Sequence, residues 1–127
     1  GIEVQGNGFA TSRSFIKSQR DTVLSALKGY VEAIHYIHRN RDEARKIIAK
    51  YLRLTDGEVL DATYTAFVKT VAKRPTPTLK GIQFMLDEVA AKMPNAKSAR
   101  PDQFVDLSLL QQLDKEGFFA EMAKRYP

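Results

Sequence analysis

The segment between Ser18 and Asn40 constrains the fold more than any other part of the chain. Its apolar residues recur at spacings of three and four, which is the period of one face of an α-helix. These residues are Val23, Leu27, Tyr30, Ile34 and Ile37, and Leu24, Val31 and His38 widen the face. Ser18 followed by Asp21 predicts the start of the helix, and Asn40 followed by Glu43 predicts a second helix directly after it. Other elements must cover so broad an apolar face.

Similar signals divide the rest of the chain into further helices. Thr55 with Glu58, Thr78 and Asp106 each resemble a helix N-cap ahead of an apolar repeat, and Pro75 and Pro77 interrupt the pattern between two helices. The predicted helices cover residues 19–39, 41–53, 56–71, 79–93 and 107–125, with a break near 114. We expect their inner faces to form one core. Its predicted members are Val23, Leu27, Tyr30, Ile34, Ile48, Phe67, Ile82, Leu86 and Val89.

The N-terminal part is predicted to be extended. Ile2, Val4 and Phe9 alternate loosely around the turn residues Gly6 to Gly8, which predicts one or two short β-strands within residues 2–16. The strand at residues 8–12 would run through a basic connector into the long helix. No later segment has a strand pattern, so these strands need partners from elsewhere. Their free edges predict strand exchange or a homo-oligomer.

The positive charge is concentrated in the first part of the chain. The net charge is +5, and residues 1–53 hold ten Lys and Arg against five Asp and Glu, whereas residues 54–127 hold ten against ten. Residues 39–53 carry many of the cations, so a small basic helical module that binds nucleic acid or a protein is an alternative interpretation. Asp42 and Glu43 are interleaved with them, which is equally typical of a solvated helix face.

No catalytic motif is present in the sequence. The chain has no cysteine, no glycine-rich phosphate loop and no histidine near a serine nucleophile signature, so we expect neither an enzyme nor a cofactor. Glu32, His35 and His38 follow one another at spacings of three and could in principle ligate a metal. Metal sites of this style need matching ligands on other helices, and the chain has no third histidine. We therefore predict an ordinary amphipathic surface and no metal site.

The polar run Thr11-Ser12-Arg13-Ser14 is a candidate binding element. Hydroxyls and a guanidinium at the carboxyl end of a strand are groups that recognise anions. The same residues are also typical of a polar connector between a strand and a helix. The residues alone leave both interpretations open.

The order of several segments resembles one family of proteins. The segments are Gly8-Phe-Ala-Thr-Ser-Arg-Ser-Phe-Ile-Lys, the helix from Thr22, the run from Asn40 to Leu52, Thr78-Leu-Lys-Gly-Ile-Gln and Phe104-Val-Asp-Leu-Ser. Together they resemble the C-terminal portion of the substrate-binding proteins of ABC importers of the nitrate, sulfonate and taurine type, a group that includes thiamine-precursor binders. The resemblance covers nearly the whole chain.

The resemblance implies a fold, a function and a site. The fold would be mainly helical with one or two N-terminal strands, as the C-terminal segment of a two-lobed type II periplasmic-binding α/β fold, and residues 1–127 would form one segment that lacks most of the cleft. The first residue is Gly rather than Met, which suggests a processed, excised or truncated chain. The function would be non-enzymatic binding of a small anionic or polar organic solute by Thr11, Ser12 and Arg13. The partners would be that solute and the membrane permease, without nucleic acid, in a periplasmic or extracytoplasmic membrane-associated location.

Overall fold

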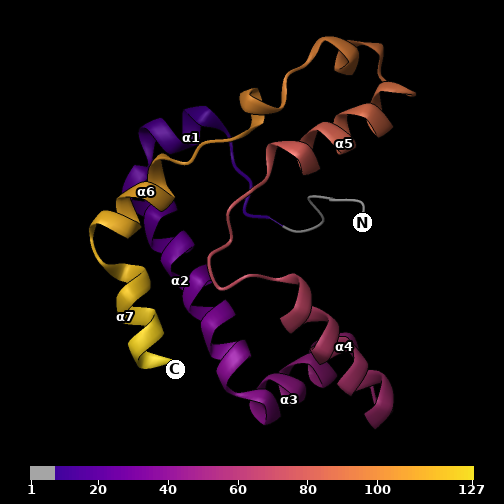
Figure 1. Cartoon of the computed structure of the whole chain (residues 1–127), viewed down its shortest axis with the longest axis vertical. Helices are drawn as coiled ribbons and strands as arrows, with labels where there is room; N and C mark the ends of the chain where they lie inside the picture. Colours follow the sequence, from indigo (N-terminus) through magenta and orange to yellow (C-terminus); the bar gives the residue numbers. More distant parts are fainter. Residues whose placement is uncertain (1–7) are drawn as a thin grey trace.

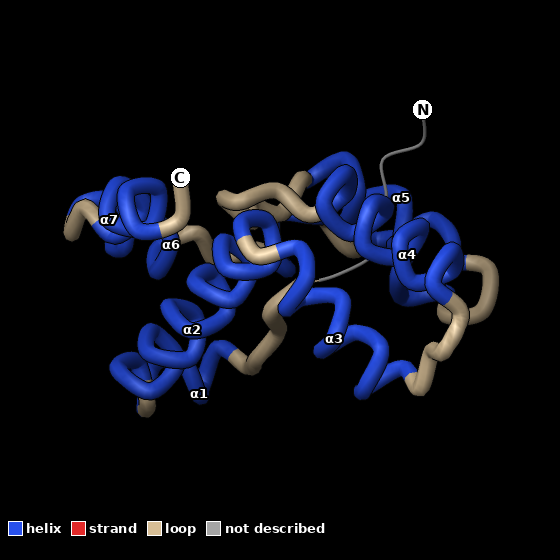
Figure 2. Tube along the Cα trace, turned by 90° about the horizontal axis from the view of Figure 1, so that it is seen from below, coloured by secondary structure: helices blue, strands red, loops and turns tan. Residues whose placement is uncertain are grey.

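The structure is a computed structural model that describes residues 8–127 of the 127-residue chain. All regular structure within residues 8–127 is helical (Figures 1 and 2). The elements are α1 (Arg13–Ser18), α2 (Arg20–Arg39), α3 (Arg41–Leu52), α4 (Gly57–Thr70), α5 (Leu79–Ala90), the 3-10 helices η1 (Pro94–Ser98) and η2 (Pro101–Phe104), α6 (Ser108–Lys115) and α7 (Phe118–Arg125).

The predicted N-terminal strands and the α/β fold are wrong for the described residues. Residues 8–12 are irregular, and the residues that follow form α1. A lone strand has no hydrogen-bonding partner here, whereas a helical turn satisfies its own backbone and buries part of Ile16 against the core. Residues 9–12 therefore offer no strand edge for exchange. The strand expected at Ile2 to Val4 lies outside the described residues.

The helix starts follow some of the predicted caps and not others. Thr78 is confirmed as the cap of α5, because its side chain accepts a hydrogen bond from the amide of Gly81. Asp56, and not Thr55, caps α4 by accepting from the amides of Glu58 and Val59. An aspartate is at least as good an N-cap as a threonine, so the adjacent carboxylate takes the position.

The cap predicted at Ser18 is displaced toward the N-terminus. Ser12 caps α1 through the amide of Phe15, and α2 follows after the single non-helical residue Gln19, which makes no side-chain cap. The side chain of Asn40 donates back to the carbonyl of Tyr36 and makes no forward cap to α3. The corner between α2 and α3 is present, but the predicted hydrogen bond from an α3 backbone amide to the Asn40 side chain is absent.

The centre of the core lies between α2 and the C-terminal helices α6 and α7. One apolar cluster of buried residues joins these elements, with Ile16, Tyr30, Phe118 and Phe119 packed around it. The buried members are Val23, Leu24, Leu27, Val31, Leu109, Leu110 and Leu113. Ile34 and Met122 are also fully buried. The C-terminal helices thus cover most of the broad face of α2.

The predicted core placed α5 against α2, and this part is wrong. Val23, Leu27 and Ile34 are buried, but Ile82 and Leu86 are only half-buried and Val89 is 40% exposed. Helix α5 packs instead on η1 and η2, away from α2 (Figure 1). Its apolar face, which also carries Leu79 and Met85, is left largely open to solvent.

The helices form an open arch around the long axis of α2. Helices α3 and α4 pack together at its C-terminal end, and α5 with η1 and η2 forms a second arm on the same side (Figure 1). Residues 71–77, here called the linker, connect the two arms. Gly117, in the left-handed region at φ 75°, turns the chain between α6 and α7, which is the break expected near residue 114.

Candidate functional site

The predicted binding residues Thr11, Ser12 and Arg13 are exposed and precede or begin α1. The Ser12 hydroxyl is engaged locally, since its Oγ accepts from the amide of Phe15 at 3.1 Å and lies 3.0 Å from the Oγ of Ser14. The sequence left open whether this run is an anion-binding element or a polar connector. Ser12 has the structural role of a connector residue, because it caps α1. The hydroxyl of Thr11 remains at the surface.

Arg13 joins the N-terminal segment to a distant part of the chain. Its guanidinium donates to the backbone carbonyl of Gln103 in η2 at 2.6 Å. Arg20, at the start of α2, donates to Gln112 at 3.1 Å and lies 3.5 Å from the hydroxyl of Ser108. These contacts place two guanidiniums beside the start of α6. We call Arg13, Arg20, Asp106 and Ser108 the α1–α6 polar cluster.

The α1–α6 polar cluster carries a net positive charge. Its one carboxylate is that of Asp106, which accepts from the amide of Ser108 at 2.9 Å. Hydrogen bonds from Ser108 hold the pKa of Asp106 below its usual value, and the positive charges of Arg13 and Arg20 act in the same direction. Two guanidiniums against one carboxylate leave one positive charge, which suits an anionic or polar group better than a cation. Sequence reasoning missed Arg20, Asp106 and Ser108 as site residues, and the last two lie more than ninety positions from Arg13 in the chain.

The histidine motif on α2 is used for tertiary hydrogen bonds. The Nε2 atom of His35 lies 3.1 Å from the carbonyl oxygen of Lys73, and that of His38 lies 2.7 Å from the carbonyl oxygen of Val71. A carbonyl oxygen only accepts, so both Nε2 atoms donate. Within residues 8–127, no three His, Cys, Asp or Glu side chains are grouped so that they could hold a metal ion.

Glu32, the third member of the motif, is occupied by α7 and the residue after it. Its carboxylate accepts from Arg125 at 2.8 Å and from the hydroxyl of Tyr126 at 2.9 Å. The hydrogen bond from Tyr126, followed by that from Arg125, lowers the pKa of Glu32. This ion pair, which needs the ionised carboxylate, holds the C-terminal helix on α2, and both hydrogen bonds end on the Oε1 atom of Glu32.

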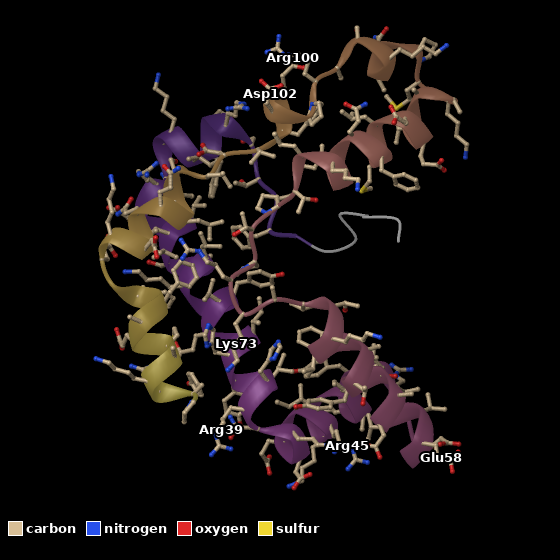
Figure 3. All side chains as sticks on the ribbon, viewed as in Figure 1. Arg39, Arg45, Glu58, Lys73, Arg100 and Asp102 are labelled. Carbon is tan, nitrogen blue, oxygen red and sulfur yellow. The ribbon has the colours of Figure 1, made fainter. Side chains whose placement is uncertain are left out.

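The basic face at residues 39–53 is partly neutralised within the chain. Arg41 and Arg45 both pair with Asp61 of α4, at 2.8 and 2.9 Å, and Lys46 pairs with Glu43 at 2.7 Å. Figure 3 shows Arg39 and Arg45 at this end of the molecule. Among the described residues, no ion pair forms to Arg39, Lys50 or Arg53, which leaves three cations open to solvent.

An exposed aromatic ring lies within this basic face. Tyr51 is 75% exposed, and the ammonium of Lys50 lies 5.5 Å from the centre of its ring. Next to this surface, α2 and α3 border an apolar groove of about 450 Å³. Its lining residues are Gly29, Glu32, Ala33, Tyr36, Ile37, Ala44, Ile47, Ile48 and Tyr126.

Comparisons of the chain with protein-family models, with curated proteins and with solved structures find no match. Among residues 8–127, no helix combines the length and the apolar character needed to cross a lipid bilayer. The chemistry of the described surface is thus the basis for a functional proposal. It contains a positively charged polar cluster, a basic face with one exposed aromatic ring, and apolar helix faces that lack a cover.

Proposed function

We propose that this chain belongs to the solute-binding component of an ABC importer and has no enzymatic activity. The solute is a small anionic or polar organic molecule of the nitrate, sulfonate, taurine or thiamine-precursor kind. The component works in the periplasm, or outside the cell at the membrane, and delivers the solute to the membrane permease. The order of segments from Gly8 to Ser108 resembles such proteins along nearly the whole chain, and this resemblance motivates the proposal.

The charge of the α1–α6 polar cluster is the observation that carries the proposal. Arg13 and Arg20 outnumber the carboxylate of Asp106, and the exposed hydroxyls of Thr11 and Ser12 lie directly before Arg13. Guanidiniums and hydroxyls are suitable partners for a sulfonate, carboxylate or nitrate group. The cluster is one open surface and not an enclosed pocket, so we expect the chain alone to bind such solutes weakly.

The test is solute uptake by cells in which the gene for this chain is disrupted. Uptake of radiolabelled taurine, an alkyl sulfonate, nitrate and a thiamine-precursor pyrimidine is measured separately. We expect the disruption to abolish uptake of one of these solutes and the native gene to restore it. Unchanged uptake of all four would contradict the proposal.

A matched pair of variants locates the binding residues. Arg13→Ala removes a cation of the α1–α6 polar cluster, and Arg53→Ala removes an exposed cation from the far end of the basic face. Arg13→Ala should lower the uptake of the imported solute, with helix content checked by circular dichroism, whereas Arg53→Ala should not. Equal effects of the two variants would show that Thr11, Ser12 and Arg13 are not the binding residues.

A second candidate is a basic helical module that binds nucleic acid. The specific observation in its favour is the exposed ring of Tyr51 beside the ammonium of Lys50, because an aromatic ring beside a cation can stack on a base. This candidate requires affinity for single-stranded DNA or RNA that falls steeply as the salt concentration rises. It also requires Tyr51→Ala to weaken that binding strongly. Without measurable affinity at low salt, the candidate is excluded.

A further inference from the structure

His35 is a buried titratable group that the proposed function does not use. Its side chain lies near the C-terminal end of α2, and the residue is only 3% exposed. Its Nε2 atom donates to the carbonyl of Lys73, the third residue of the linker between α4 and α5. Lys73 is labelled in Figure 3. The neutral ring therefore carries its hydrogen on Nε2 and presents Nδ1 as an acceptor.

The Nδ1 atom of His35 is buried and has no hydrogen-bond partner among the described residues. In the neutral ring this atom carries no hydrogen, so its burial costs the loss of one acceptor interaction. Protonation would place an N–H group and a positive charge at the same buried position without an acceptor. Burying an unpaired charge is far more costly than burying an unpaired acceptor.

The groups around His35 compensate such a charge only in part. Burial is the largest influence that lowers the pKa of His35, and the positive charge of Lys73 and the ring of His38 act in the same direction. The hydrogen bond to the backbone carbonyl of Lys73 favours the cation, but the other influences outweigh it. The nearby carboxylates are engaged elsewhere. Glu32, one turn earlier on α2, is bound by Arg125 and Tyr126, and Asp114 of α6 pairs with Arg74 at 2.8 Å.

The linker has other attachments to the rest of the molecule besides the hydrogen bond from His35. His38 donates to the carbonyl of Val71, and Arg74 contacts Asp114 and the ring of Phe119 at the surface. The ammonium of Lys73 lies 3.4 Å from the carbonyl oxygen of Tyr126. Because the linker joins the α3–α4 arm to the α5 arm, its contact with α2 contributes to how the arms lie relative to α6 and α7, together with the packing of α3 on α2.

We propose that His35 is an acid-sensitive switch that holds the linker on α2 while its ring is neutral and releases the linker when the ring is protonated. The direction of the pH effect follows from the linkage between protonation of His35 and attachment of the linker. The pKa of His35 is lowered in the attached state and returns toward its ordinary value of about 6.5 in the released state. The attachment is therefore strongest above about pH 6.5 and weakens as the pH falls toward the lowered pKa.

The experiment combines two measurements on the full chain between pH 8 and pH 4.5. The chain has only two histidines, so nuclear magnetic resonance of the ring protons follows each of them separately. The chain has no cysteine, so spin labels can be placed on cysteines introduced at the exposed positions Lys69 of α4 and Gln111 of α6. Pulsed electron resonance then measures the distance between the α3–α4 arm and α6, and circular dichroism monitors helix content.

We expect the distance distribution to broaden as the pH falls, with the same midpoint as the His35 titration and with helix content unchanged. His35→Gln keeps an amide donor near the position of Nε2 but cannot be protonated, so its distance distribution should not respond to pH. His38→Gln is the matched control and should respond like the native chain.

Two results would overturn the proposal. One is a distance distribution that stays constant in the native chain at pH values where the resonances show His35 to be protonated. The other is an acid response in His35→Gln equal to that of the native chain. If His35→Gln has lost its helix content, the native chain decides the question: the pH midpoint of the distance change is compared with that of the His35 titration, and different midpoints contradict the proposal.

Discussion

The substitution Leu113→Ala tests whether α6 covers the apolar face of α2. Leu113 is 0% exposed and belongs to the central cluster, whereas Leu52 of α3 is 59% exposed. Truncation of a leucine to alanine removes three carbon atoms, worth about 2.4 kcal/mol at about 0.8 kcal/mol each when fully buried. A residual cavity adds to this loss, so we expect Leu113→Ala to lower the free energy of unfolding by about 3 to 5 kcal/mol.

Leu52→Ala is the matched control for this prediction. The same atoms are removed, but more than half of the side chain is already in water, so the expected loss is about 1 kcal/mol or less. Urea denaturation followed by circular dichroism at 222 nm gives the free energy of unfolding of both variants. The comparison is valid when this free energy falls with urea concentration at the same slope in each. Equal destabilisation by the two substitutions would refute the packing of α6 on α2.

Two further substitutions test individual contacts. Tyr64 is buried and its hydroxyl donates to the carbonyl of Ile37 at 3.0 Å, so Tyr64→Phe should cost about 0.5–1.5 kcal/mol in urea denaturation, whereas Tyr51→Phe at the surface should cost nothing measurable. The pKa of Glu32 is lowered below its ordinary 4.5, so its contribution to stability is present above pH 4.5 and is lost as the pH falls through the lowered pKa. Glu32→Gln should therefore be less stable than the native chain at pH 7, and the difference should shrink in acid; a difference that does not change with pH would contradict the ion pair with Arg125.

Local signals were sufficient to place most helices. The apolar period of three and four extends from Val23 to Ile37, and α2 spans Arg20–Arg39, close to the expected residues 19–39. Thr78 caps α5 as predicted. These features depend on residues within four positions of one another, which is the range over which a helix forms its hydrogen bonds.

Pairing between helices could not be predicted in the same way. Helix α5 has an apolar face that includes Ile82, Leu86 and Val89, and α6 has one that includes Leu110 and Leu113. Either face could cover α2, because periodicity shows which side of a helix is apolar and not which helix it contacts. The choice of α6 and α7 depends on the turn at Gly117 and on contacts distant in the chain.

The N-terminal strands and the α1–α6 polar cluster also depend on contacts between distant segments, which local sequence patterns do not predict. Phe9 to Ser12 alternates as a strand does, but the described chain offers it no partner strand, and Ser12 caps a helix instead. Arg13 was predicted as a site residue from its immediate neighbours and from the family resemblance of its segment. Its contact with Gln103 and its position beside Asp106 join residues about ninety positions apart, and no pattern within the sequence connects them.

Purification of the chain from its own cells, after chemical crosslinking in the intact cells, tests the importer role most directly. Mass spectrometry identifies the crosslinked partners, and a strain that lacks the gene provides the background. We predict that the membrane permease of an ABC importer is crosslinked to the chain and that the chain is recovered outside the cytoplasm. Recovery of the chain in the cytoplasm, bound to nucleic acid and without any permease, would contradict the proposed function.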